Sequence, residues 1–288
     1  STQAAWAQLG SGTTAGVAVD ADGVLRKQVV ADPAGQLMRE RVAAAKAELN
    51  PDVTKLSTLR KVSLTRLERA IMERDGVLGD EMQKLAGLLR VKYVFFYPET
   101  KDIVIAGPAE GWVTNPAGRV VGMTTNRPTL LLEDLVVALR AFPPSAEGTS
   151  LIGCSIDPTQ EGLAAMQDFL RRTGTTFVGA PSPAVAEQLA TGLQSSLGLQ
   201  NVRIEGIAPD THFAQVMVEA DYRMKLIGIG MEEPPVQLAS FVELANPAQV
   251  SRNALQRWFF VPDYQCVRVS DDGFAMELVG DGVKLVGE

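Results

Sequence analysis

Histidine and cysteine are scarce in this sequence of 288 residues, which holds one histidine, His212, and two cysteines, Cys154 and Cys266. A zinc site needs three or four Cys, His or carboxylate ligands, and the helix of an HExxH metalloprotease needs two histidines. Any catalytic triad must therefore use His212, and any Cys–His dyad must pair it with one of the two cysteines. This scarcity predicts no metal site and favours a protein that is not an enzyme.

Long apolar runs, basic clusters and nucleotide-binding motifs are also absent. No run approaches the roughly 20 apolar residues that span a membrane. The longest Lys/Arg cluster is Arg171-Arg172 and the net charge is −7, which excludes a general nucleic-acid binder. No Walker GK[ST] occurs, and Gly228-Ile229-Gly230 does not continue as GxGxxG, so we predict no cofactor.

The start of the chain lacks two further features. Residues 1–10 have neither the charged nor the apolar region of a signal peptide, and the chain begins at Ser1 without an initiator methionine. We therefore expect a piece of a longer polypeptide. The composition is that of a folded protein, with 46% hydrophobic and 21% charged residues.

The first half of the chain predicts hairpins and helices. A hairpin over residues 15–30 turns at Asp20–Gly23, and Asp32-Pro33 opens a helix to about Glu48. Asn50–Lys61 is expected to be a polar connection. The remaining elements expected before residue 143 are a helix over 64–74 capped by Ser63, a helix over 81–89, a hairpin over 91–106, a strand over 118–123 and a nearly buried helix over 130–142.

After a linker at Pro143–Gly148, strand and helix patterns alternate. The expected strands cover residues 150–156, 176–179, 202–207 and 225–229, and the expected helices cover 159–172, 182–197 and 210–223. This alternation predicts an α/β layer over about 150–230 that is at least partly parallel. If the segment at Thr176 is a loop instead, split β-α-β units remain.

A β-meander is expected at the C-terminus, over Trp258–Glu288, with turns at 271–273 and 280–282. The fold class is therefore mixed α/β, with N-terminal hairpins and helices, an alternating layer and the meander. The predicted domains are residues 1–57, 58–148 and 149–288, or 58–288 as one domain.

Two hypotheses concern the cysteines. Cys154 ends a predicted strand and His212 follows one, each near a helix start. A thiolate at Cys154 with His212 as base and Asp210 or Asp157 as orienting group is therefore chemically sensible. The structural alternative is a buried Cys154, an N-cap at Asp210 and an exposed His212. A Cys154–Cys266 disulfide would join the alternating layer to the meander, and two separate thiols are the alternative.

Two further patterns could bind a ligand. The helix after His212 carries a polar stripe that includes Gln215, Glu219 and Arg223, which could read a ligand or form a solvated face with a Glu219–Arg223 pair. A second set of aromatic residues could form a sugar or peptide platform, although core packing is the default: Trp112, Trp258, Phe259, Phe260 and Tyr264.

Several stretches of residues 80–288 resemble an uncharacterised domain family of exported proteins from planctomycete-type bacteria. The stretches are residues 91–94, 105–112, 153–159, 219–225 and 257–260, among them Gly153-Cys154-Ser155-Ile156-Asp157-Pro158-Thr159. The resemblance implies an extracytoplasmic setting in the periplasm or at the cell surface, which would favour the disulfide. It implies no catalytic residue.

We expect a non-catalytic extracytoplasmic module that packs against other protein chains or further domains of its own polypeptide in an envelope or surface assembly, with oligomers among the options. The first alternative is a cysteine hydrolase or transferase using Cys154 and His212. The second is a small-ligand or glycan-binding domain, for which the candidate residues are Arg223, Glu219 and Trp258.

Overall fold

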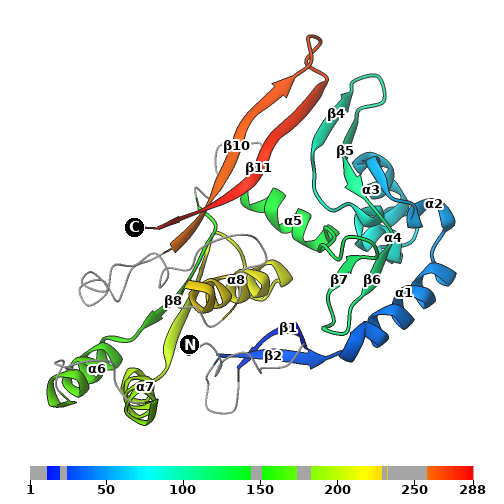
Figure 1. The fold of residues 1–288 in the computed structure, drawn as a ribbon. Coiled ribbons are helices and arrows are strands. Elements are labelled where there is room, and N and C mark those ends of the chain that lie inside the picture. Colours follow the sequence, from blue (N-terminus) through cyan, green and yellow to red (C-terminus); the bar gives the residue numbers. More distant parts are fainter. Residues whose placement is uncertain are drawn as a thin grey trace. The chain divides into compact units, whose positions relative to one another are not determined.

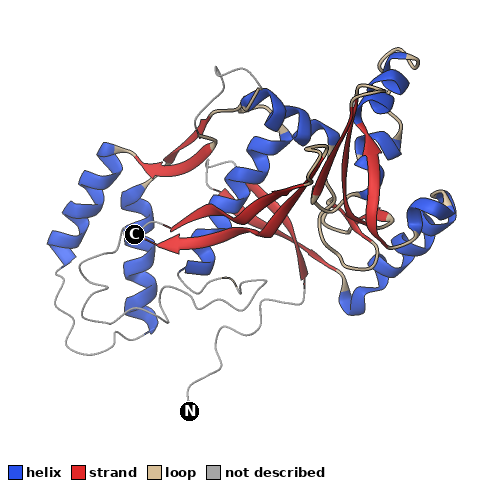
Figure 2. Cartoon of the chain, turned by 90° about the horizontal axis from the view of Figure 1, so that it is seen from above, coloured by secondary structure: helices blue, strands red, loops and turns tan. Residues whose placement is uncertain are grey.

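The computed structural model describes residues 12–19, 25–143, 151–173, 183–228, 232 and 258–287 (Figure 1). These residues form helices and antiparallel strands, which confirms the mixed α/β class (Figure 2). The chain divides into two compact units. Unit 1 comprises residues 1–17, 27–138 and 246–288, and unit 2 comprises residues 18–26 and 139–245.

The described helices and strands follow one another along the chain in this order: β1 Gly12–Val19, β2 Leu25–Ala31, η1 Pro33–Gly35, α1 Gln36–Glu48, α2 Pro51–Thr54, β3 Ser57–Ser63, α3 Leu64–Met72, α4 Asp80–Gln83, η2 Leu85–Gly87, β4 Tyr93–Tyr97, β5 Asp102–Ala109, β6 Trp112–Thr114, β7 Val120–Gly122, α5 Leu132–Ala141, β8 Gly153–Pro158, α6 Gln160–Thr173, α7 Pro183–Leu197, β9 Gln200–Glu205, α8 His212–Gly228, β10 Trp258–Val269 and β11 Ala275–Gly287. The predicted hairpins β1–β2 and β4–β5 are both confirmed. The turn between β1 and β2 lies outside the described residues, and so do most of the predicted linker and the predicted strand at 176–179.

A five-stranded antiparallel sheet in the order β10-β11-β4-β5-β3 is the centre of unit 1. The predicted meander was wrong, because β10 and β11 form one hairpin around the turn at residues 271–273. The second expected turn lies inside β11, where Gly280 has a φ of 120° and pairs with Tyr264 at a bulge. A Cβ at Gly280 would lie 2.7 Å from the Asp263 carbonyl oxygen, so the backbone needs a glycine here. The glycine therefore marks a bulge within β11 and not the predicted turn.

Residues 50–61 are not the polar connection that the sequence predicts, because they hold α2 and most of strand β3. Asn50 caps α2, and its side chain accepts a hydrogen bond from the Asp52 amide at 2.9 Å. Strand β3 pairs with β5 at the edge of the sheet, where its polar side chains can face solvent. The polarity of the segment therefore reflects its place in the sheet.

The predicted helix at residues 81–89 is broken into the short elements α4 and η2. Leu85, Ala86 and Gly87 all have positive φ values, of 47°, 52° and 77°. This tight bend lets Leu85 and Leu88 both enter the core, where they are 1% and 0% exposed. Burial of these two leucines outweighs the local preference for a continuous helix.

The main hydrophobic cluster of unit 1 packs against strand β5 of the five-stranded sheet. Leu85 and Leu88 pack there with Ile105 and Ala109 of β5. The partly buried side chains around them come from β3, α3, the chain before β4 and the start of α5: Val62, Leu64, Leu67, Val91, Leu130, Leu132 and Leu135. Residues separated by up to 73 positions, from Val62 to Leu135, therefore form one core.

Helix α3 confirms the predicted cap at Ser63. The Ser63 hydroxyl oxygen accepts a hydrogen bond from the Arg66 amide at 3.0 Å. The same hydroxyl lies 2.9 and 2.8 Å from the carboxylate oxygens of Asp102, to which it donates. The cap therefore joins the start of α3 to the start of β5.

Helix α5 is less buried than its apolar sequence predicts. Its first turn enters the core of unit 1, but Leu139 and Phe142 are 54% and 52% exposed. The expected strand over 118–123 is β7, and it pairs with a three-residue strand, β6, that the sequence did not predict. These short strands lack the length over which alternation becomes recognisable.

Unit 2 is antiparallel in its described strands, so the prediction of a partly parallel layer was wrong for these. Helix α6 leaves the end of β8, and α7 returns to it. Strand β9 therefore begins beside the residue where β8 ends, with Gln200 opposite Pro158, and runs in the opposite direction. Two successive helices reverse the chain, whereas a parallel pair needs a crossover that returns to the start of the first strand.

Residues 225–228 continue α8 and do not begin the predicted strand. Lys225 forms an ion pair of 2.7 Å with Asp221, one turn earlier. Its ammonium group also donates to the Ile156 carbonyl oxygen of β8 at 3.0 Å. These contacts favour helix at a segment whose isoleucines suggested a strand.

Candidate functional site

A hollow of about 600 Å³ opens at one end of the sheet in unit 1. It lies between the turn that joins β4 to β5 and the turn that joins β10 to β11, which are both at the top of Figure 1. Four aromatic side chains, two acidic side chains and four smaller residues line it: Phe95, Phe96, Tyr97, Pro98, Glu99, Thr100, Ser270, Asp272, Phe274 and Ala275. This volume is in the range of known ligand sites.

Hydrogen bonds within the two turns give the hollow its walls. In the β10–β11 turn, the Asp272 carboxylate accepts hydrogen bonds from the Ser270 hydroxyl at 2.6 Å and the Phe274 amide at 2.9 Å. In the β4–β5 turn, the Thr100 amide donates to the Tyr97 carbonyl oxygen at 3.2 Å. A bond of 2.8 Å from the Phe96 amide to the Phe274 carbonyl oxygen joins the two walls.

The rim of the hollow is aromatic and acidic. Tyr97 and Phe274, which both line the hollow, are 42% and 47% exposed, and so much exposed ring surface is unusual for aromatic side chains. The hydrogen bonds from Ser270 and Phe274 hold the pKa of Asp272 below its usual range, so this group remains a carboxylate in mild acid. Sequence reasoning missed this site, because its aromatic residues look like ordinary strand residues.

The structure does not place Cys154 where the cysteine hydrolase hypothesis needs it. Cys154 is the second residue of β8, so it lies near the beginning of the strand and not at the end before α6. Burial, with a contribution from Asp221, raises the pKa of its thiol to about 11, against the opposing effect of Lys225. A catalytic thiol needs the opposite shift.

His212 begins α8, far from the part of the helix that acts on Cys154. Asp221 and Lys225 are the charged groups that influence the thiol, and Asp221 follows His212 by nine residues in the helix. At about 1.5 Å per residue, that separation is roughly 14 Å along the axis. Asp210 is not the N-cap, because Thr211 accepts the capping hydrogen bond from the Ala214 amide at 3.2 Å.

We predict that Cys154 reacts slowly with iodoacetamide in the folded protein. At pH 8, a thiol of pKa about 11 is about 0.1% thiolate, so the reaction should be on the order of 100-fold slower than that of an unperturbed thiol. Peptide mass spectrometry after timed alkylation measures the rate, and protein unfolded in urea is the control. Fast alkylation of Cys154 below pH 7 would contradict the prediction and revive the hydrolase hypothesis.

Cys154 and Cys266 are free thiols in this structure, half-buried and exposed respectively. Cys154 belongs to unit 2 and Cys266 to unit 1. The disulfide remains a prediction, and the intact mass of the native protein without reductant tests it. A bonded protein is lighter by two hydrogen atoms and does not react at either position until it is reduced.

The polar stripe of α8 contains the predicted Glu219–Arg223 pair, with an oxygen–nitrogen distance of 3.2 Å. Arg223 also donates from Nε to Glu232 at 2.7 Å. Desolvation lowers the pKa of Arg223, but the two carboxylates outweigh it and raise the pKa overall. These carboxylates already engage the guanidinium, which favours a structural role over ligand binding.

The predicted aromatic platform does not form around Trp112. Trp112 is 4% exposed, and its indole nitrogen donates to the Asp80 carboxylate at 2.6 Å. Core packing is therefore confirmed for Trp112. Tyr264 is 51% exposed on β10, and the side chains of Trp258, Phe259 and Phe260 lie outside the described residues.

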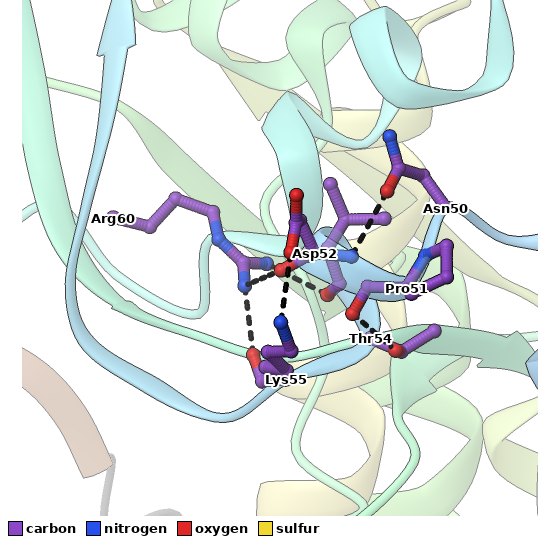
Figure 3. Close-up of polar contacts among 7 residues, drawn as sticks. Asn50, Pro51, Asp52, Thr54, Lys55 and Arg60 are labelled. Carbon is purple, nitrogen blue, oxygen red and sulfur yellow. Dashed lines mark hydrogen bonds and ion pairs between the residues drawn. The ribbon is translucent and has the colours of Figure 1, made fainter.

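Two charged groups of unit 1, the half-buried Arg60 and the buried Glu110, are structural. The Arg60 guanidinium donates to the carbonyl oxygens of Asp52, Val53 and Lys55 at 2.7 to 3.3 Å (Figure 3). It also donates to the carbonyl oxygen of Ala86 at 2.8 Å. Burial lowers the pKa of Arg60. Four carbonyl acceptors use up most of the five N–H donors of this side chain, so it holds α2 and η2 against β3.

Glu110 is 0% exposed between β5 and β6. Its carboxylate accepts hydrogen bonds from the Thr124 amide at 2.6 Å, the Thr125 amide at 3.1 Å and the Thr125 hydroxyl. Sequence reasoning did not single out Glu110, because nothing in the sequence distinguishes a buried glutamate from an exposed one. Its hydrogen bonds anchor the loop after β7.

The described residues contain neither a metal-binding cluster nor a membrane-spanning helix. No group of three His, Cys, Asp or Glu side chains that could hold a metal ion occurs among these residues. No described helix is both long enough and apolar enough to cross a membrane.

Residues 154–241 are similar to a family described as a protein of unknown function, DUF1598. This segment runs from the second residue of β8 past the end of α8 and lies in unit 2. It includes most of the stretch 153–159 and all of 219–225, so the resemblance to an uncharacterised family is supported for that segment. No curated protein and no solved structure matches the chain.

Proposed function

We propose that this chain is a non-catalytic module that binds other protein through the hollow at the end of its five-stranded sheet. The observation that carries the proposal is the pair of half-exposed rings, Tyr97 and Phe274, beside a hollow of about 600 Å³. Aromatic side chains are enriched at protein interfaces, because they bury a large area with few rotatable bonds.

The candidate catalytic groups support a non-catalytic role. Two observations weigh against a cysteine nucleophile: the raised pKa of Cys154, and the separation of nine residues along α8 between His212 and Asp221, whose charge acts on the thiol. The chain has no second histidine that could serve instead. An extracytoplasmic setting belongs to the proposal and comes from the resemblance of the sequence to exported proteins.

A small-ligand or glycan-binding domain is the second candidate, and the volume of the hollow favours it. The residues that line the hollow are however not the ones that the sequence suggested for a ligand site. Of those, Trp112 is buried and Arg223 belongs to unit 2. A wide opening with two exposed rings offers more area than a small ligand covers. We therefore rank protein binding first.

Site-specific photo-crosslinking tests the proposal. The photoreactive p-benzoylphenylalanine is placed at Tyr97, at Phe274 or, as control, at Met72, which is 66% exposed elsewhere in unit 1. In the producing cells, we expect a discrete protein adduct from the first two positions and none from the third. Purified partner, or a second copy of the chain, should then reproduce the adduct in vitro.

Equal or no adduct formation at the three positions would overturn this proposal. Analytical ultracentrifugation of the unmodified chain shows separately whether the partner is a second copy. Loss of the adduct on addition of a free sugar or another small molecule would favour the second candidate.

A further inference from the structure

We propose that the hollow binds a basic side chain, arginine or lysine, that an extended protein segment presents to it. This inference rests on the proposed function and names the chemistry of the partner. Three observations carry it: the arrangement of the rings, the sign of the charges around them and the exposure of the rim.

The aromatic strand β4 already holds cations within the protein. The Lys61 ammonium lies 4.8 Å from the centroid of the Phe95 ring, and the Lys92 ammonium lies 5.1 Å from the Tyr93 ring. Both distances are inside the range of about 6 Å in which a ring face attracts a cation. The Phe95 and Tyr93 rings therefore already contact a cation of the protein itself. A cation from a partner would contact other rings near the end of the strand.

Phe96 and Phe274 occupy neighbouring positions on adjacent strands. Side chains alternate along a strand, so Phe96 leaves β4 on the face opposite to Phe95 and its lysine, whereas Tyr97 leaves it on the same face as Phe95. The bond from the Phe96 amide to the Phe274 carbonyl oxygen continues the pairing of β4 with β11, which places these two residues side by side. Within the part of the chain that the structure describes, the lysines over rings are Lys61 and Lys92.

Both charged residues in the lining are acidic, although the Lys61 ammonium lies over the ring of Phe95, which also lines the hollow. The acidic residues are Glu99 and Asp272, and no lining residue is basic. Asp272 is held in place by the Ser270 hydroxyl and the Phe274 amide. A guanidinium or ammonium group between these carboxylates would gain both ion pairing and ring contact, whereas an acidic segment would be repelled.

The exposure of the rim favours a protein segment over a small free cation. Tyr97 and Phe274 stay 42% and 47% exposed, and Pro98 adds a further apolar surface. A small cation would leave this rim in water. An extended segment inserts one side chain and lays its neighbours against the rim, because alternate side chains point to opposite sides.

Fluorescence anisotropy with labelled peptides tests the inference on the full chain. The probes are hexapeptides that alternate alanine with arginine, lysine, citrulline or glutamate, and free arginine amide is the competitor. Citrulline has nearly the shape of arginine without its charge. We expect the arginine and lysine peptides to bind at least about tenfold more tightly than the citrulline peptide, and the glutamate peptide not to bind.

Two variants locate the site. Glu99→Gln should weaken binding of the arginine peptide about fivefold, and Tyr97→Ala about tenfold. Glu73→Gln is the matched control, since Glu73 is an exposed acid at the end of α3, and it should have no effect. All three positions are exposed, so the melting temperature of each variant should match that of the wild type.

Each negative result contradicts one part of the two proposals. If citrulline and arginine peptides bind equally, or Glu99→Gln and Glu73→Gln behave alike, the proposal that the hollow recognises a basic side chain is wrong. Crosslinks at Tyr97 would still support the proposal that the chain binds other protein. If free arginine amide binds as tightly as the peptide, the proposal that an extended protein segment presents the side chain is wrong. If neither crosslinks nor peptide binding occur, the proposed function fails as well.

Discussion

Glu110→Ala is expected to lower the free energy of unfolding of unit 1 by about 3 to 5 kcal/mol. The variant removes a carboxylate that is 0% exposed and that accepts hydrogen bonds from Thr124 and Thr125. Their amides lose this acceptor in a place where water does not easily replace it. The loop after β7 then loses its anchor.

Urea unfolding followed by tryptophan fluorescence, to which the buried Trp112 contributes, measures this effect. Glu110→Gln keeps the shape and one acceptor oxygen, so it should lose about half as much stability. Glu68→Ala, on the exposed side of α3, is the control and should stay within about 0.5 kcal/mol of the wild type. A small effect of Glu110→Ala would show that water can accept the hydrogen bonds of the Thr124 and Thr125 amides once the carboxylate is gone.

The stability contribution of Glu110 depends on pH. Burial would raise its pKa, but the hydrogen bonds from the Thr125 hydroxyl and the Thr124 amide outweigh burial and hold the pKa below its usual range. The contribution is therefore fully present above the unfolded pKa of about 4.3 and is lost as the pH falls through the folded pKa. The stability difference between wild type and Glu110→Gln should shrink below about pH 4.

Gly87→Ala is expected to destabilise unit 1 by about 3 kcal/mol or more. A Cβ at this position would lie 2.0 Å from the backbone carbonyl oxygen of Glu110 and 3.0 Å from the Trp112 ring. Both neighbours are buried, so neither can move away cheaply. The Glu110 amide also donates to the Gly87 carbonyl oxygen at 3.2 Å, so a displaced Gly87 disturbs the Glu110 loop.

Gly76→Ala is the matched control for the backbone strain. Gly76 has a φ of +84°, close to the +77° of Gly87, but nothing lies within 4 Å of its would-be Cβ. It should cost only the strain of a left-handed alanine, about 1 kcal/mol. The difference between the two urea midpoints isolates the steric contact, and equal losses would show that the contact is relieved by a small shift.

Local signals determined much of the secondary structure. Ser63 predicted the start of α3, Asp271–Gly273 predicted a hairpin turn, and alternation predicted strands β4 and β5. Each of these signals depends on neighbouring residues, through a cap, a turn or a strand face. They are readable without knowledge of the rest of the chain.

Contacts between distant residues decided what local signals could not. Leu85 and Leu88 look helical, but their burial against β5 breaks the helix, and Gly280 looks like a turn but allows a bulge opposite Tyr264. The candidate site is of the same kind. Phe96 and Phe274 are separated by 178 positions and become neighbours only through the pairing of β4 with β11.

The sequence by itself determined the class of the fold, the helix cap at Ser63 and the scarcity of catalytic side chains, because composition and short-range patterns carry that information. Only the tertiary structure decided the strand order, the burial of Glu110 and the assembly of the hollow. Strand order depends on which hydrophobic faces pack together, and a side chain's exposure depends on everything that covers it.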